Sequence, residues 1–223
     1  AAVATIERRV GAGAELDVPL EALIASYGLP TEFSPATLAQ AETLSLDVEK
    51  TLAEESDRKD LRSTLAVTVD PADARDYDDA VGAVRRADGY ELWVHIADVS
   101  AYVKWNDAID NEAKQRTCSV YLVDRVLPML PEQLSNELCS LKPHEDRLAM
   151  SVHMRLSPSG RIIDAEAMRS VIRSSARLSY DEVDAMLLGE TAAPTQEIGE
   201  TISVLDEIRS LREHLRVQRG SID

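Results

Sequence analysis

Five aspartates lie within ten consecutive positions of this 223-residue chain, and they form its densest group of residues able to do chemistry: Asp70, Asp73, Asp76, Asp78 and Asp79. Ionised carboxylates a few ångströms apart repel one another and raise each other's pKa values, so a converging set needs an opposing charge. Mg²⁺ or Mn²⁺ would supply that charge, because hard cations prefer oxygen ligands. The alternative is an ordinary solvated turn, since aspartate is common in loops.

The residues around the aspartates favour a site. A short apolar, β-branched run at 65–69 precedes them, and a second run at 80–84 follows directly. Both runs are typical of strands, and sites are often built where strands end. A calcium-binding EF-hand loop starting at Asp70 would need Gly and Glu where Arg75 and Val81 stand. A divalent-metal site of another kind is therefore the better interpretation.

Both strands and helices are expected around this loop. Asp88-Gly89 is a strong hairpin signal between the runs 80–84 and 90–97. Further strands are predicted at 119–123, 148–156 and 161–173. Helices are predicted at 17–28, at 34–48 with one buried face, at 107–116, near 132–138, at 180–188 and at 198–217. The charged stretch 54–60 is predicted to be a surface connection.

Composition limits the classes of protein. The net charge is −16, from 24 basic and 40 acidic residues, which argues against a surface that binds nucleic acid throughout. A channel lined by cations remains compatible with this charge. No run of about 18 apolar residues is present, so no transmembrane helix is expected. We interpret Cys118 and Cys139 as small buried hydrophobic residues in a reducing compartment, which favours the cytoplasm.

The spacing of Asp70, Asp76, Asp78 and Asp79 resembles the active-site signature of the ribonuclease II/ribonuclease R family. Further matches follow at family spacing, and they are the segments 92–100, 119–122 with 126–141, and 174–180. The resemblance covers roughly residues 61–189. Together with the order of the expected elements, it predicts an α+β fold. The sheet would be mixed and mainly antiparallel, with surrounding helices and a preceding helical segment.

The resemblance implies a 3′→5′ exoribonuclease, which hydrolyses single-stranded RNA from its 3′ end and releases nucleoside 5′-monophosphates. Two divalent ions about 3.5–4 Å apart would stabilise the attacking and leaving oxygens. By motif position, Asp70, Asp76 and Asp79 look like metal ligands. Asp78 looks like both a ligand and the catalytic carboxylate on which the chemical step depends most. Mg²⁺ is the implied cofactor, with Mn²⁺ as a possible substitute, and Asp73 is set aside as a solvated loop residue.

Two further residues are implied to contact RNA. Tyr121 resembles the family's aromatic residue that stacks on a base near the 3′ end, and such stacking is worth about 1–3 kcal/mol per base. A tyrosine packed within a strand is the alternative. Arg177 lies within the third match and is a candidate RNA contact. The implied partner is single-stranded RNA, and no membrane is involved.

The resemblance also predicts a domain organisation. Residues 1–58 would form a helical connector, and residues 59–223 the N-terminal part of the family's catalytic (RNB) domain. That domain continues past Asp223 in the family, where it supplies an arginine-containing motif and a second aromatic, so we expect a fragment. Three hypotheses stay open: an exoribonuclease, a catalytically incomplete fragment that only binds metal or RNA, and an unrelated metal-dependent phosphohydrolase.

Overall fold

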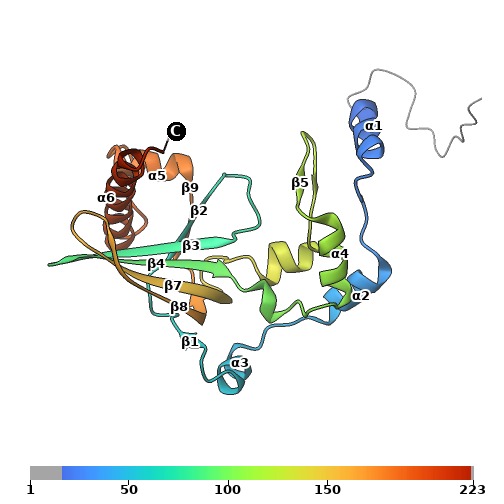
Figure 1. Ribbon diagram of the computed structural model, residues 1–223, viewed down its shortest axis with the longest axis horizontal. Coiled ribbons are helices and arrows are strands. Elements are labelled where there is room, and N and C mark those ends of the chain that lie inside the picture. The colour runs from blue at the N-terminus through green and yellow to red at the C-terminus, as the bar shows by residue number, and fades with distance from the viewer. Residues whose placement is uncertain (1–16, 222–223) are drawn as a thin grey trace, which may run out of the picture. The chain divides into compact units, whose positions relative to one another are not determined.

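A computed structural model describes residues 17–221 of the chain, which divide into two compact units (Figure 1). One comprises residues 17–44 and 103–132, and we call it the helical unit. The other comprises residues 45–102 and 133–221, and we call it the sheet unit. Within the described range, none of the helices combines the length and apolar character needed to cross a membrane.

The helical unit contains three helices and a short strand pair: α1 (Asp17–Tyr27), α2 (Pro35–Thr43), α4 (Ala108–Arg116), β5 (Val120–Tyr121) and β6 (Val126–Leu127). Helices α2 and α4 both begin at side-chain N-caps. Ser34 accepts a hydrogen bond from the Thr37 amide, and Asp107 accepts one from the Asp110 amide. Helices α2 and α4 pack together, and the Gln40 amide nitrogen donates to Asp107 Oδ2 at 2.6 Å.

The sheet unit is built on a seven-stranded sheet in the order β1-β8-β7-β4-β3-β2-β9. Its strands are β1 (Lys59–Asp60), β2 (Val67–Asp70), β3 (Asp79–Arg86), β4 (Gly89–Ala97), β7 (Asp146–Leu156), β8 (Ile162–Arg173) and β9 (Ala176–Ser179). Only the outer pairs, β1–β8 and β2–β9, are parallel. The α+β fold with a mixed, mainly antiparallel sheet is therefore confirmed.

Short helical segments connect the strands: α3 (Val48–Glu54), the 3₁₀ turn η1 (Val99–Ala101) and the π-helix η2 (Gln133–Leu138). The predicted hairpin joins β3 to β4, with Arg86 paired to Gly89 across a two-residue turn. Gly89 has φ +144°, and a Cβ there would lie 1.9 Å from the Leu156 carbonyl oxygen. Glycine is thus required at this turn for both conformation and space.

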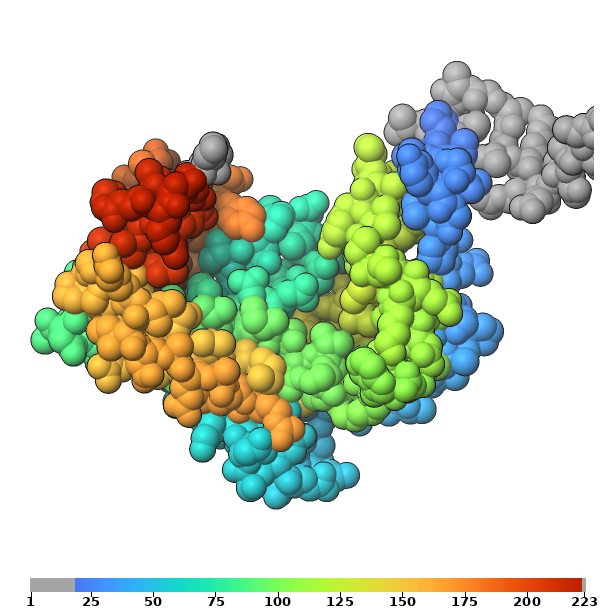
Figure 2. Space-filling view, viewed as in Figure 1, coloured from blue at the N-terminus to red at the C-terminus, as the bar shows by residue number. Residues whose placement is uncertain are grey.

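Two helices, α5 (Tyr180–Leu187) and α6 (Gln196–Gln218), pack on the sheet beside β2, β3 and β9. The buried core beneath α6 falls into two clusters: Ala83, Tyr90, Leu156, Val204 and Ile208, and Val67, Leu178, Ile198 and Ile202. In Figure 2 the red surface of α6 adjoins the gold turn between β7 and β8, where Arg212 donates to the Gly160 carbonyl at 3.3 Å. This packing holds β2 and β3, the strands that flank the aspartate loop.

Three expectations from the sequence were wrong. The helix predicted over 34–48 ends at Thr43, and Leu38 on its supposed buried face is 45% exposed. Asp47 instead caps a separate helix, α3, by accepting from the Lys50 amide, so a new start signal overrides the apolar spacing. Of the two cysteines expected to be buried, Cys139 is buried but Cys118 is exposed.

The third wrong expectation concerns the charged stretch 54–60, which is not only a surface connection. Arg58 is 5% exposed and makes three hydrogen bonds, to Glu55, to Asp98 and to the Ser170 carbonyl. The carboxylates of Glu55 and Asp98 neutralise the guanidinium, and each of its three nitrogens has a hydrogen-bond acceptor, which makes burial of the arginine tolerable. The stretch then enters the sheet as β1.

Candidate active site

The aspartate loop connects two antiparallel neighbours of the sheet. Strand β2 ends at Asp70 and β3 begins at Asp79, while Val67 pairs with Val81. Because antiparallel neighbours begin and end at the same edge, the sheet brings the first and last aspartates of the motif together. Asp76 and Asp78 lie on the loop between them. The strand–loop–strand arrangement predicted from the sequence is therefore confirmed.

The four motif carboxylates lie within electrostatic reach of one another. Desolvation first, and then the charges of Asp79 and Asp76, raises the pKa of Asp70. Asp78 retains access to solvent, yet desolvation, followed by the charges of Asp76, Asp79 and Asp70, raises the pKa of this carboxyl too. The charge of Arg177 opposes the rise at Asp70 but does not cancel it, so the group keeps an excess of negative charge.

One oxygen of this group has no partner. Asp70 Oδ2 is buried and makes no hydrogen bond within the described part of the chain. A buried carboxylate oxygen without a donor or cation is unfavourable. The unbalanced charge and the all-oxygen donor set fit a hard divalent cation such as Mg²⁺.

The potential metal ligands are not clustered tightly in this structure. Among residues 17–221, no three His, Cys, Asp or Glu side chains are close enough together to hold an ion. Asp70, Asp76, Asp78 and Asp79 fit a cation by their all-oxygen chemistry and their charge. Asp73 is exposed on the outer part of the same loop.

The loop backbone is held by residues far away in sequence. The Ser140 hydroxyl accepts from the Tyr77 amide at 3.1 Å and donates to the Arg75 carbonyl at 2.9 Å. The Leu141 amide donates to the Tyr77 carbonyl at 2.8 Å. The Ala97 amide donates to the Asp78 carbonyl, also at 2.8 Å. The central turn of the loop is thus fixed on the sheet unit.

The two residues expected to contact RNA have different surroundings. Tyr121 lies on β5 of the helical unit and is 69% exposed, so a packed strand tyrosine is the poorer description. Arg177 lies on β9, and its Nη2 donates to the Pro71 carbonyl at 3.0 Å and to the Ala72 carbonyl. The guanidinium of Arg177 is thus engaged with the aspartate loop itself.

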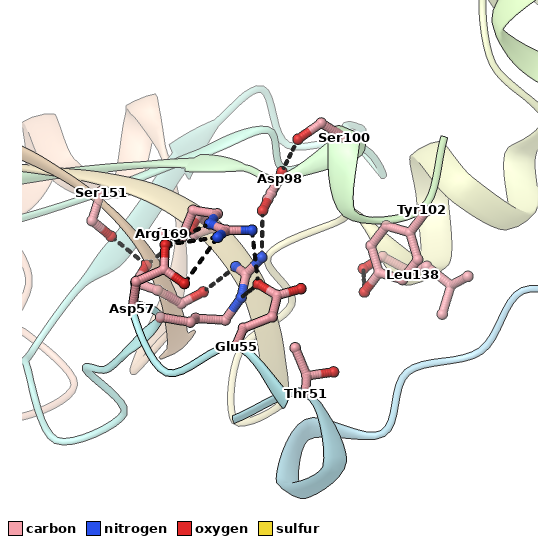
Figure 3. Close-up of polar contacts among 12 residues, drawn as sticks. Thr51, Glu55, Asp57, Asp98, Ser100, Tyr102, Leu138, Ser151 and Arg169 are labelled. Carbon is pink, nitrogen blue, oxygen red and sulfur yellow. Dashed lines mark hydrogen bonds and ion pairs between the residues drawn. The ribbon is translucent and has the colours of Figure 1, made fainter. Parts of the chain in front are cut away.

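A buried ion pair lies beside the loop's attachment to β4 (Figure 3). Arg58 Nη2 lies 2.8 Å from Asp98 Oδ2, and Ser100 donates to Asp98 Oδ1 at 2.6 Å. Burial alone would raise the pKa of Asp98, but the hydrogen bonds from Ser100 and Arg58 outweigh it and hold the pKa below its usual value. Asp98 directly follows Ala97, the residue that holds the Asp78 carbonyl.

Sequence reasoning missed Arg58 and gave no role to Ser140 or Asp98. Cys139 is buried nearby, and burial, followed by the charges of Asp78 and Asp98, raises the pKa of its thiol to about 12. The thiol therefore stays protonated at neutral pH. One sequence signal could have pointed to Asp98 and Ser140. They lie inside the matched segments 92–100 and 126–141.

Comparison with known proteins identifies the family of the chain. The RNB domain model matches residues 58–223. Ribonuclease R 1 of Lactococcus lactis is 41% identical over 217 residues, which are 96% of this chain and 26% of that protein. The chain thus spans about a quarter of that relative's length.

Solved structures give the same result. The RNase R of Mycoplasma genitalium in complex with ribose-methylated single-stranded RNA is 34% identical, with a TM-score of 0.88 over 92% of this chain and 32% of that one. Yeast Ssd1, described as a pseudonuclease, is 25% identical, with a TM-score of 0.63 over 78% of this chain and 21% of that one. The chain belongs to the RNB domain family.

Proposed function

We propose that this chain is the metal-binding part of a 3′→5′ exoribonuclease that hydrolyses single-stranded RNA to nucleoside 5′-monophosphates. The observation that supports this best is the carboxylate group itself. Asp70, Asp76, Asp78 and Asp79 share one loop, and desolvation together with their mutual repulsion raises the pKa values of Asp70 and Asp78. Perturbed groups of this kind are concentrated at functional sites.

The relatives support the same activity. The similar proteins include the ribonuclease R of Lactococcus lactis, and the RNase R of Mycoplasma genitalium has been solved with single-stranded RNA bound. Membership of the family makes the third hypothesis, an unrelated phosphohydrolase, wrong. A cytoplasmic location is part of the proposal, because RNA turnover takes place there.

In the proposed site, Asp70, Asp76, Asp78 and Asp79 would hold two Mg²⁺ ions, or Mn²⁺ in their place. When bound, such ions activate water and stabilise charge on the phosphate oxygens. Asp78 would be the carboxylate on which hydrolysis depends most. Tyr121 would stack on a base near the 3′ end, where an exposed ring tolerates any sequence.

The proposal includes the domain organisation expected from the sequence. Residues 59–223 would be the N-terminal part of the catalytic domain, and residues 1–58 a connector, of which 1–16 lie outside the described residues. The described part of this connector holds α1, α2 and α3. The remainder of the active site would come from the same full-length protein.

A second candidate is a protein that binds metal or RNA without turnover. The likeness to yeast Ssd1 is the reason to consider this candidate, since that protein is described as a pseudonuclease. The fold alone therefore does not establish activity, which depends on the carboxylates of the site. The four aspartates of the motif are all present in this chain, which supports the exoribonuclease.

The experiment uses the natural full-length protein and a 5′-labelled RNA with a single-stranded 3′ end. With Mg²⁺, we expect progressive shortening from the 3′ end and release of nucleoside 5′-monophosphates, both abolished by EDTA. A circular RNA of the same sequence should remain intact, because it has no 3′ end. Metal-dependent binding without any monophosphate would favour the second candidate, and cleavage of the circle would contradict the exonuclease.

A further inference from the structure

The aspartate loop is anchored at two places by side chains outside it. At its centre, Ser140 is fully buried and its hydroxyl bridges the Arg75 carbonyl and the Tyr77 amide. One hydroxyl thus serves as acceptor and donor for two backbone groups on either side of Asp76. The neighbouring Leu141 amide adds a third bond, to the Tyr77 carbonyl.

The second anchor is Arg177, which acts on the beginning of the loop. Its Nη2 donates to the carbonyls of Pro71 and Ala72, the two residues that follow Asp70. The guanidinium carbon also lies 5.7 Å from the centre of the Tyr77 ring, a cation–π distance. The Tyr77 hydroxyl donates to the Ala74 carbonyl at 3.0 Å, so Tyr77 links the region held by Arg177 to the turn held by Ser140.

Both anchors bind the backbone of residues between the aspartates. The hydrogen bonds of Ser140 and Arg177 end on residues 71, 72, 75 and 77, so none of these bonds uses a motif carboxylate oxygen. Repulsion among like charges favours an open loop. The two anchors oppose that opening from the loop backbone, and their own hydrogen bonds occupy none of the motif carboxylate oxygens.

We propose that Ser140 and Arg177 are positioning residues that hold the backbone of the aspartate loop for divalent-metal binding, an inference that rests on the proposed function. They act through the loop backbone and touch neither metal nor substrate. Arg177 therefore serves the loop rather than the RNA. Groups that orient metal ligands in this way change metal affinity or activity by about 10–100-fold when removed.

The test compares Ser140→Ala and Arg177→Met with matched controls in the full-length protein. Ser170→Ala removes another fully buried hydroxyl, which bonds to the Ala149 carbonyl and to Ser151. Arg173→Met removes an arginine from the neighbouring strand segment, where it pairs with Asp146. Mn²⁺ binding is measured by calorimetry without RNA, and the Mg²⁺ dependence of RNA hydrolysis is measured separately.

We expect Ser140→Ala and Arg177→Met each to weaken Mn²⁺ binding about tenfold or more and to shift the Mg²⁺ midpoint of activity upward. Saturating Mg²⁺ should restore most of kcat, and Arg177→Lys, which keeps a donor and the charge, should restore part of the affinity. Both controls should bind Mn²⁺ like the wild type. If Ser140→Ala does not fold, the partly exposed Arg177 still provides the test.

Two outcomes overturn the inference. Unchanged Mn²⁺ binding and an unchanged Mg²⁺ midpoint in both variants would show that the anchors are only structural. A raised KM for RNA with an unchanged metal midpoint in Arg177→Met would make Arg177 an RNA contact instead. Failure of the proposed function is separate, since Asp78→Asn would then bind Mn²⁺ as tightly as the wild type.

Discussion

Arg58 and Asp98 form an ion pair at 2.8 Å in which both side chains are only 1% exposed. Forty residues of chain separate them, and the pair joins the segment entering β1 to the end of β4. Removing one partner of such a pair leaves an unpaired buried charge, which costs about 3–5 kcal/mol. The pair therefore stabilises the end of β4, where the Ala97 amide holds the Asp78 carbonyl.

The first prediction concerns this pair. Arg58→Met should lower the local free energy of opening of β4 and β8 by about 3–5 kcal/mol, because Asp98 remains buried without its partner. Hydrogen-exchange mass spectrometry of peptides from these strands measures the change. Arg169→Met, which breaks the more exposed pair with Asp57, should cost no more than about 1 kcal/mol. Equal protection in the two variants would contradict the role of the pair.

The second prediction concerns His95, which is fully buried and hydrogen-bonded to Ser151 at 2.6 Å. Burial lowers its pKa from 6.5 to about 4. Between those values the unfolded state binds a proton that the folded state does not, so stability falls as pH decreases from 6.5 towards 4. This single group should cost up to about 3 kcal/mol over that window.

The effect of His95 can be isolated by substitution. His95→Gln should remove that part of the loss of stability, so its unfolding free energy changes less between pH 6.5 and pH 4 than that of the wild type. His214→Gln, on the exposed surface of α6, should keep the wild-type slope. Parallel pH profiles for wild type and His95→Gln would show that His95 does not titrate as described.

The third prediction separates two effects of Asp78: its repulsion of the other motif carboxylates and its binding of metal. Asp78→Asn should raise the Tm of the metal-free protein, because the raised pKa means that the charged carboxylate is disfavoured in the folded state. The same variant should lose most of the Tm increase that Mg²⁺ produces in the wild type. Thermal unfolding in EDTA and in Mg²⁺ measures both effects, and a metal-free Tm below that of the wild type would contradict the account.

The fourth prediction concerns Tyr121. Tyr121→Ala should weaken binding of single-stranded RNA by roughly 5–150-fold, the equivalent of about 1–3 kcal/mol of stacking on one base. Tyr121→Phe keeps the aromatic face and should bind nearly as the wild type does. Fluorescence anisotropy with a labelled RNA measures both. Equal binding by the alanine and phenylalanine variants would remove Tyr121 from the site.

Local signals explain why much of the fold was predictable. The caps at Ser34 and Asp107, the hairpin at Asp88-Gly89 and the strand end at Asp70 each depend on a few neighbouring residues. Such signals can be read directly from the chain. The loop between two strands, and hence the grouping of its aspartates, followed from them.

Long-range contacts explain what was missed. Arg58 can be buried because Asp98 and the Ser170 carbonyl accept its hydrogen bonds. No local sequence pattern predicts partners so far away along the chain. The role of Ser140 depends on backbone groups 63 and 65 positions away. Arg177 was predicted as an RNA contact from its place in the third match, and its bond to the Pro71 carbonyl, 106 positions away, could not be read from the sequence.

The most direct test of the central claim compares Asp78→Asn with Asp73→Asn in the full-length protein. Each removes one negative charge from the same loop, but only Asp78 belongs to the motif. The measurement is the rate of nucleoside 5′-monophosphate release from a 3′-overhang RNA in saturating Mg²⁺. The account predicts near-complete loss in Asp78→Asn and near-wild-type release in Asp73→Asn. Equal rates in the two variants would contradict it.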